Sequence, residues 1–217
     1  MASLQDLVWG PSHGTTPRSA LFMLHGLGAD GRDLIDLGRY FAPTLPETLF
    51  IAPHGPQAFD MAPFGRQWFS MQSLDPAKLE AGVIEAAKAL ESYIDETLTA
   101  HNLTSYAILG FSQGAMVALY GGPRAKRPPA AILAYSGGLL GGATLGLEAR
   151  SHPLILLAHG MKDDIVPVSA SQSAELTLRA TGFRVKSVYD HDLGHALSER
   201  GLEAGATLLN AAFGDAI

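Results

Sequence analysis

Short, almost uninterrupted apolar runs alternate with longer segments in which apolar residues recur every three or four positions. The apolar runs end at glycine, proline or a cluster of polar residues, as strands that are buried on both faces do. We therefore expect strands at residues 19–26, 48–53, 105–110, 130–137, 153–160 and 183–190.

The segments between these runs predict helices at residues 31–42, 76–98, 112–122, 169–182 and 196–213. In the second of them, Asp75 is a suitable N-cap and Pro76 suits the first helical position. Its apolar residues then follow at helical spacing: Leu79, Val83, Ala87, Leu90, Ile94 and Leu98. The helix at 112–122 is expected to end at its glycines and at Pro123.

This alternation of strands and helices predicts an α/β fold, with a mostly parallel central sheet covered by helices on both faces. A length of 217 residues, with no linker or repeat, predicts one domain over residues 1–217. In such sheets, ligands bind beyond the carboxyl ends of the strands, so the chemistry is expected there.

The composition excludes several classes of function. The formal net charge is −6 and there is no basic stripe, which argues against nucleic acid and anionic membranes as partners. The chain has no cysteine, so disulfides, a thiolate nucleophile and cysteine-bound metals are excluded. There is no signal-like N-terminus and no apolar run of membrane-spanning length, so we expect a cytoplasmic protein without stable membrane insertion. The oligomeric state stays open.

The most informative motif is "GFSQG" at residues 110–114, which lies between a predicted strand and a predicted helix. A G-x-S-x-G motif in this context is typical of a nucleophile elbow. The strained turn holds the serine hydroxyl clear of the sheet, and small neighbours let the strand and helix approach closely. Ser112 is therefore the candidate nucleophile.

A serine nucleophile needs a base, and the base needs an acid that orients it. In this architecture the acid and then the base follow the serine in the chain. His191 and His195 both follow the last predicted strand. We favour His195 as the base, because a flexible glycine precedes it, and interpret His191 as a solvated loop residue. The acid is expected after the strand at 153–160, where Asp163 and Asp164 are adjacent and spacing alone does not choose between them.

Two backbone N–H groups are expected to form the oxyanion hole. One belongs to Gln113, directly after the serine. The other is assigned to Leu27, in the glycine-containing stretch "HGLGAD" at residues 25–30. We interpret His25 as a structural residue whose ring binds loop backbone.

Together, these motifs resemble the carboxylesterase/acyl-protein thioesterase family of α/β-hydrolases. The matching pieces are "LHGLGAD", "QWF" at 67–69, "GFSQG", "HGMKDDIVP" and "GH" at 194–195, in the same order over nearly the whole chain. The resemblance implies an α/β-hydrolase fold with Ser112, Asp163 and His195 as catalytic residues and Leu27 and Gln113 as the oxyanion hole. It leaves Asp164 as a residue that binds backbone N–H groups in the following turn. Ala115 and Ser70 depart from the family's common residues.

The loop at residues 54–74 is long and rich in aromatic and methionine side chains, which is typical of a functional loop. Phe64, Trp68 and Met71 are the candidate substrate-binding residues, and Trp68 is also expected to anchor the loop on the core. A glycine-rich stretch at residues 136–149 is a candidate for the opposite wall of the site.

These inferences predict a serine hydrolase that cleaves small-molecule carboxylic esters of short to medium acyl chain through an acyl-enzyme on Ser112. No metal or cofactor is expected. Three alternatives stay open: a thioesterase acting on acyl-protein or acyl-CoA, an acyltransferase, and a non-catalytic binding protein on the same fold. A complete set of catalytic residues disfavours the last of these.

Overall fold

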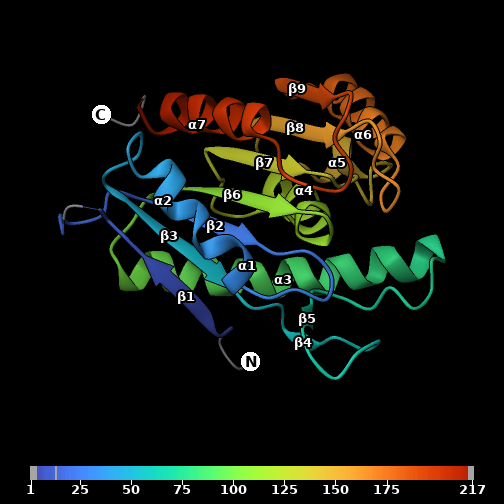
Figure 1. Cartoon of the computed structure of the whole chain (residues 1–217), viewed down its shortest axis with the longest axis horizontal. Coiled ribbons are helices and arrows are strands. Elements are labelled where there is room, and N and C mark those ends of the chain that lie inside the picture. Colours follow the sequence, from blue (N-terminus) through green and yellow to red (C-terminus); the bar gives the residue numbers. More distant parts are fainter. Residues whose placement is uncertain (1–3, 13, 215–217) are drawn as a thin grey trace.

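The computed structural model describes residues 4–12 and 14–214 and contains a seven-stranded central sheet in the order β1-β3-β2-β6-β7-β8-β9 (Figure 1). Its first strand runs antiparallel to β3, and every other neighbouring pair is parallel. The strands are β1 (Asp6–Trp9), β2 (Ser19–Leu24), β3 (Thr48–Pro53), β6 (Ser105–Phe111), β7 (Ala131–Tyr135), β8 (Leu154–Gly160) and β9 (Val185–Asp190). The predicted mostly parallel sheet is confirmed.

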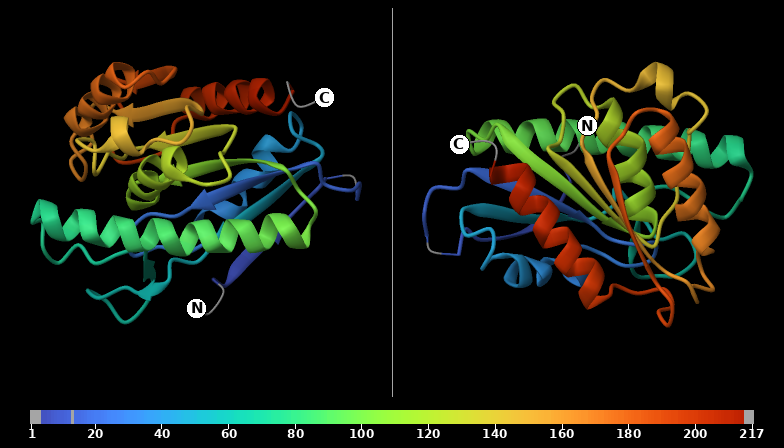
Figure 2. Two further views of the ribbon diagram at one scale, coloured as in Figure 1. Left: turned by 180° about the vertical axis from the view of Figure 1, so that it is seen from behind. Right: turned by 90° about the horizontal axis from the view of Figure 1, so that it is seen from above.

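Helices cover both faces of this sheet, as predicted (Figure 2). Helices α3, α4 and α6 lie on one face, and α1, α2 and α7 lie on the other. The helices are α1 (Arg32–Ile35), α2 (Leu37–Phe41), α3 (Pro76–Ala100), α4 (Gln113–Arg124), α5 (Leu145–Glu148), α6 (Val168–Ala180) and α7 (Glu199–Gly214). Within the described residues, no helix is long and apolar enough to cross a membrane.

The central strands are apolar at consecutive positions because each of their faces packs in a separate core. In β2, Phe22 and Leu24 face the core beneath α3 and α4, whereas Leu21 and Met23 face the core beneath α1, α2 and α7. All four side chains are fully buried. This two-sided burial explains the uninterrupted apolar runs.

The order of the strands reverses between β2 and β6. The chain passes from β2 to β3 on one side and then returns across β2 to pair β6 with its other edge. Such a switch point opens a crevice beyond the carboxyl ends of the two strands. The stretch "HGLGAD" follows β2 and the elbow "GFSQG" follows β6, so both lie at this crevice.

Several elements differ from the prediction at the periphery. The edge strand β1 was not predicted, because it is four residues long and only half-buried. The helix predicted at 31–42 is divided into α1 and α2 at Asp36. The loop at 54–74 contains a small hairpin of β4 (Gln57–Ala58) and β5 (Arg66–Gln67). The glycine-rich stretch at residues 136–149 contains α5. The prediction of one domain over residues 1–217 stays a prediction.

The predicted N-terminus of α3 is confirmed, and the predicted end of α4 is not. Asp75 Oδ1 accepts hydrogen bonds from the N–H groups of Ala77 and Lys78, at 3.0 and 3.1 Å. Helix α4 instead continues through its glycines and Pro123 to Arg124. A Cβ atom on Gly122 would lie 2.5 Å from Ile132 Cδ1, so this glycine allows the helix to pack closely on β7.

Candidate active site

Ser112 occupies a strained turn between β6 and α4. Its backbone has φ 54° and ψ −116°, a conformation that residues with a side chain rarely adopt. Its N–H donates to the Tyr135 carbonyl of the neighbouring strand at 2.9 Å, which helps to hold the turn. This is the strand–turn–helix geometry expected of a nucleophile elbow.

The glycines on either side of Ser112 are required by close backbone contacts. A Cβ atom on Gly110 would lie 2.4 Å from the carbonyl group of Gly114. A Cβ atom on Gly114 would lie 2.1 Å from the Leu24 carbonyl oxygen at the end of β2. Both distances are far below van der Waals contact, so the spacing of the motif follows from the packing of β6, α4 and β2.

The candidate acid and base are joined by a hydrogen bond. His195 Nδ1 lies 2.7 Å from Asp163 Oδ2. The other carboxylate oxygen of Asp163 accepts the N–H groups of Ile165 and Val166, at 3.0 and 2.8 Å. The Asp163 side chain is fully buried, whereas the His195 side chain keeps 18% of its surface exposed.

These contacts keep Asp163 ionised. Burial pushes the pKa of Asp163 upward, but the hydrogen bonds from His195, Val166 and Ile165 outweigh it, and the pKa lies below its usual range. With the carboxylate ionised, His195 carries a hydrogen on Nδ1 and donates it to Asp163. In the neutral ring, Nε2 is then the unprotonated nitrogen, as a general base requires.

The loops that carry the acid and the base are joined through their backbones. The N–H of Lys162 donates to the Leu193 carbonyl at 2.9 Å, and the N–H of Met161 donates to the Asp190 carbonyl at 2.8 Å. A Cβ atom on Gly160 would lie 2.3 Å from the carbonyl oxygens of Leu193 and Gly194. Glycine at the end of β8 therefore allows the base loop to lie directly against the acid loop.

Ser112 and His195 line the same cavity, which has a volume of about 300 Å³. This cavity lies beyond the carboxyl ends of β2 and β6, where the strand order predicts a site. Most of its wall is apolar, and its lining residues are Gly26, Leu27, Ala29, Asp33, Leu34, Met71, Phe111, Ser112, Met116, Ile165, Val166 and His195.

Of the three candidate substrate-binding residues, only Met71 lines this cavity. Trp68 is 1% exposed and packs in the core, where its indole N–H donates to the His25 carbonyl at 3.0 Å. Phe64 is 76% exposed near the tip of the loop at 54–74. The wall expected from residues 136–149 is instead formed by Met116, Ile165 and Val166.

The two candidate oxyanion donors lie on different loops beside Ser112. Leu27 lines the cavity in the loop after β2, and Gln113 follows Ser112 as the first residue of α4, where helix N–H groups point toward the elbow. The Gln113 side chain is fully buried and has a different task. Its Oε1 accepts the N–H of Trp68 at 2.9 Å, and its Nε2 donates to the Phe69 carbonyl at 2.7 Å, which fastens the loop at 54–74 to the elbow.

His25 binds loop backbone through both ring nitrogens, as expected. The Gly55 N–H donates to Nε2 at 2.8 Å, so Nδ1 carries the ring hydrogen and donates it to the Gly26 carbonyl at 2.7 Å. Burial, partly opposed by the bond to Gly26, lowers the pKa of His25, and the ring is neutral. This residue joins the two loops that border the site.

The two alternative residues lie at the surface. His191 and Asp164 are both exposed. Asp164 was expected to accept backbone N–H bonds in the turn before Pro167, but Asp163 Oδ1 accepts those bonds. One aspartate therefore organises the turn and binds His195 at the same time.

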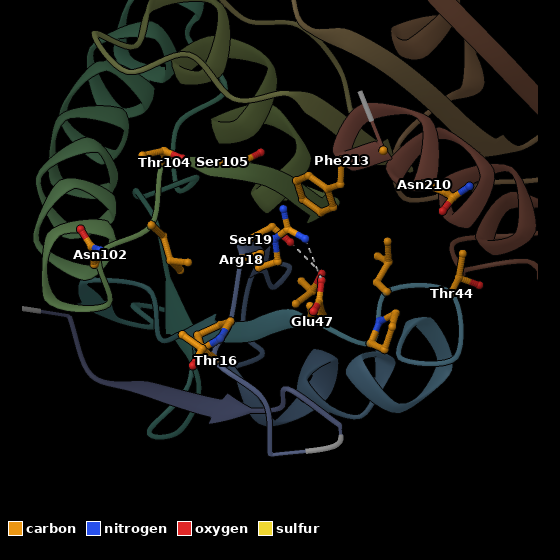
Figure 3. A pocket seen from close by; sticks show the side chains of 16 residues that line it. Thr16, Arg18, Ser19, Thr44, Glu47, Asn102, Thr104, Ser105, Asn210 and Phe213 are labelled. Atoms are coloured by element: carbon orange, nitrogen blue, oxygen red, sulfur yellow. Dashed lines mark hydrogen bonds and ion pairs between the residues drawn. The ribbon is translucent and has the colours of Figure 1, made fainter. Parts of the chain in front are cut away.

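A second hollow, of about 490 Å³, lies at the opposite end of the sheet (Figure 3). Its lining includes the first residues of three parallel strands, Ser19, Thr48 and Ser105. An ion pair between Arg18 and Glu47, at 3.5 Å, crosses it. Ser112 follows the carboxyl end of β6, whereas Ser105 begins that strand, so this hollow is separate from the candidate site.

A model of the phospholipase/carboxylesterase family matches residues 12–212, which is most of the chain. The chain belongs to this family. Membership confirms the resemblance and the α/β-hydrolase fold inferred from the sequence, and it confirms a hydrolase that acts on esters.

Individual relatives are esterases and thioesterases. The chain is 27% identical to esterase YpfH of Escherichia coli (strain K12) over 186 residues, which cover 84% of this chain and 78% of that protein. It is 29% identical to acyl-protein thioesterase 1 of Mycosarcoma maydis over 192 residues, covering 79% and 80% of the two chains. The crystal structure of esterase PE8 superposes with a TM-score of 0.91, at 33% identity, and covers 97% of this chain and 100% of that one.

Sequence reasoning missed several side chains of the cavity. Phe111 packs against the His195 ring, with the ring centroids 4.8 Å apart. Met116 follows Ser112 by four residues, so helical spacing could have placed it beside the nucleophile. Leu34 reaches the cavity from α1, and Ile165 and Val166 reach it from the loop after β8; no local pattern marks them.

Proposed function

We propose that the protein is a serine carboxylesterase that uses Ser112 as nucleophile, His195 as general base and Asp163 as the acid that orients the base. The observation that carries this proposal is the hydrogen bond between His195 and a buried Asp163 beside a cavity that Ser112 also lines. The strained backbone of Ser112 and the family assignment support it.

In the first half of the proposed reaction, Ser112 Oγ adds to the ester carbonyl carbon and its proton moves to His195 Nε2. The carbonyl oxygen becomes negative and accepts hydrogen bonds from the N–H groups of Leu27 and Gln113. Removing one such donor typically lowers kcat by ~10²–10³. Asp163 stabilises the imidazolium through the Nδ1–H bond. The intermediate then expels the alcohol, which takes the proton from His195 and leaves the acyl group on Ser112.

In the second half, water replaces the alcohol. His195 takes a proton from water as the oxygen adds to the acyl carbon, and the same two N–H groups bind the oxyanion again. Collapse of this intermediate breaks the bond to Ser112 Oγ, which recovers its proton from His195. The carboxylic acid leaves, and the steps require no metal or cofactor.

The cavity supports small-molecule esters with acyl chains of short to medium length. Its volume of about 300 Å³ is at the lower end of the range for ligand pockets. The apolar side chains of Leu34, Met71 and Met116 suit an acyl group. The exposed carboxylate of Asp33 at the same cavity disfavours a strongly anionic leaving group such as coenzyme A.

Thioester cleavage is the second candidate activity. One of the relatives is an acyl-protein thioesterase, and the same nucleophile, base and oxyanion hole would cleave a thioester. An acyltransferase would also use these residues, and a binding protein would need none of them. Small-molecule substrates, no nucleic-acid partner, no stable membrane insertion and a cytoplasmic location stay predictions. The oligomeric state stays open.

The test is hydrolysis of p-nitrophenyl butyrate and of butyryl-coenzyme A by wild type and by Ser112→Ala. We expect the wild type to cleave the oxygen ester faster, and the alanine variant to lose nearly all activity at an unchanged Tm. A fluorophosphonate probe should label the wild type at Ser112 alone. Product analysis with added alcohol separates hydrolysis from acyl transfer. An active Ser112→Ala variant, or labelling at another residue, would contradict the proposal.

A further inference from the structure

His159 lies at the centre of a buried polar cluster that the proposed reaction does not use directly. It stands near the carboxyl end of β8, four residues before Asp163, and its side chain is fully buried. Its Nε2 lies 2.8 Å from the Val166 carbonyl oxygen and 3.1 Å from Asp163 Oδ2. Its Nδ1 lies 2.6 Å from Ser171 Oγ at the start of α6.

The position of one ring hydrogen follows from these neighbours. A carbonyl oxygen and a carboxylate oxygen can only accept hydrogen bonds, and both lie against Nε2. Therefore Nε2 carries a hydrogen, which it donates to the Val166 carbonyl. The positive end of this N–H bond also lies against Asp163 Oδ2.

Asp163 Oδ2 is consequently shared by two imidazole rings. His195 Nδ1 approaches it at 2.7 Å and His159 Nε2 at 3.1 Å. Among the described residues, these are the titratable side chains in contact with the carboxylate, one from β8 and one from the loop after β9. Oδ1 is occupied by the N–H groups of Ile165 and Val166.

We propose that His159 is a positioning residue for the hydrolysis reaction, which acts through Asp163 and sets the negative charge that Asp163 presents to His195. This inference rests on the proposed function. His159 holds the turn at 163–166 from one side through the Val166 carbonyl, while Asp163 holds it from the other through the Val166 N–H. Its N–H also offsets part of the carboxylate charge whether His195 is neutral or protonated.

The same ring connects the acid to the strand beside the nucleophile. Ser171 Oγ lies 2.6 Å from Nδ1 and 2.7 Å from the Gly137 carbonyl oxygen, and so links the ring to that segment. Gly137 follows β7, and a Cβ atom there would lie 3.1 Å from the Ser112 carbonyl oxygen. His159 therefore fixes the acid turn relative to the segment that packs against the elbow, which a hydrocarbon side chain of equal size would not do.

The expected effect on His195 has a definite direction. Without the His159 N–H, Asp163 presents more negative charge to His195, and a protonated His195 is favoured. The neutral base is then available only at higher pH. We expect His159→Leu to shift the acidic limb of the pH profile of kcat/KM toward higher pH by about one unit. This is the low end of the effect that a neighbouring charge has on a pKa. We expect kcat/KM at its plateau to fall about 10- to 100-fold, well below the ~10⁴ loss on amidating a triad acid.

The experiment measures kcat/KM for p-nitrophenyl butyrate against pH, with Tm, in wild type, His159→Leu, His159→Gln and His152→Leu. Glutamine keeps an N–H donor, so its acid limb should return to the wild-type position. His152, just before β8, contacts the Thr181 carbonyl at 3.2 Å and is the matched control. A lowered Tm with an unchanged acid limb in His159→Leu would make the residue merely structural and overturn the proposal.

A second measurement does not depend on variant folding or on activity. Imidazole ¹⁵N spectra of the wild type, with His159 assigned through His159→Gln, should show a hydrogen on Nε2 near neutral pH that exchanges slowly with solvent. An unprotonated Nε2 would overturn the proposal. If the wild type neither hydrolyses the ester nor reacts with a fluorophosphonate at Ser112, the proposed function fails instead, and the ¹⁵N result still decides whether His159 binds the acid turn.

Discussion

Replacing Asp163 with asparagine should nearly abolish turnover while leaving the protein folded, because the surrounding donors fix the orientation of the new amide. Two N–H groups, from Ile165 and Val166, point at Oδ1. The amide oxygen takes that position, since an NH₂ group there would face two backbone donors that cannot become acceptors. At the other position the NH₂ group faces one fixed donor, the His159 N–H, because His195 can change its tautomer. The NH₂ group then replaces Oδ2 and faces His195 Nδ1.

In that orientation His195 must accept a hydrogen at Nδ1 and carry its own hydrogen on Nε2. This tautomer cannot take a proton from Ser112. The loss expected when a triad acid is amidated is ~10⁴ in kcat, which corresponds to about 5.4 kcal/mol of transition-state stabilisation. Hydrogen bonds to a charged group contribute about 1 kcal/mol more than neutral ones, so three weakened bonds should lower the free energy of unfolding by about 3 kcal/mol.

Asp164→Asn is the matched control, because Asp164 is adjacent but exposed. Single-turnover acylation by a p-nitrophenyl ester should be slowed about 10⁴-fold in Asp163→Asn and changed less than about two-fold in Asp164→Asn. Urea titrations of both variants verify that they are folded. Full acylation by folded Asp163→Asn, together with a slow Asp164→Asn, would refute the assignment of the acid.

The remaining predictions concern the cavity, the elbow, pH and metals. Met71→Ala should shift the preferred p-nitrophenyl ester toward longer acyl chains, whereas Phe64→Ala, at an exposed position, should leave the chain-length profile unchanged. Gly114→Ala should unfold at a clearly lower temperature, because its Cβ atom would lie 2.1 Å from the Leu24 carbonyl oxygen. The lowered pKa of Asp163 provides stability that is present above its unfolded-state value, about 3.9, and is lost as pH falls through the folded value. The urea midpoint should therefore drop more steeply below about pH 5 in wild type than in Asp163→Asn. EDTA should leave ester hydrolysis unchanged, and a loss that zinc restores would contradict the proposed steps.

The central strands and the site loops could be predicted because each follows from local chemistry. The apolar runs reflect burial on both faces of the sheet. The elbow is marked by glycines at 110 and 114 that the backbone contacts require. The choice between Asp163 and Asp164 could not be made from spacing, because it depends on which carboxylate the turn directs inward. Only the resemblance favoured Asp163, and its assignment as the acid stays a proposal.

Features that depend on contacts between distant segments were not predictable. The β1 strand is too short and exposed to leave a pattern. Phe64 and Trp68 occur in the same aromatic-rich loop, yet one is exposed and the other buried, because Gln113 and His25 bind the backbone and ring of Trp68. The partners of His159 lie in the turn at 163–166 and at the start of α6, and a lone histidine in a strand signals neither of them.

The attachment of the loop at 54–74 has a consequence for how this protein can diverge. The base of the loop is held at Gly55 by His25 and at Trp68 and Phe69 by Gln113, and both anchors lie beside the reacting groups. The tip, which carries Phe64, is exposed. Substitutions, insertions or deletions at the tip therefore leave the anchors in place. The tip can therefore vary in sequence and length over generations without disturbing the chemistry beside the anchors, whereas changes of substrate preference are expected at cavity-lining residues such as Met71.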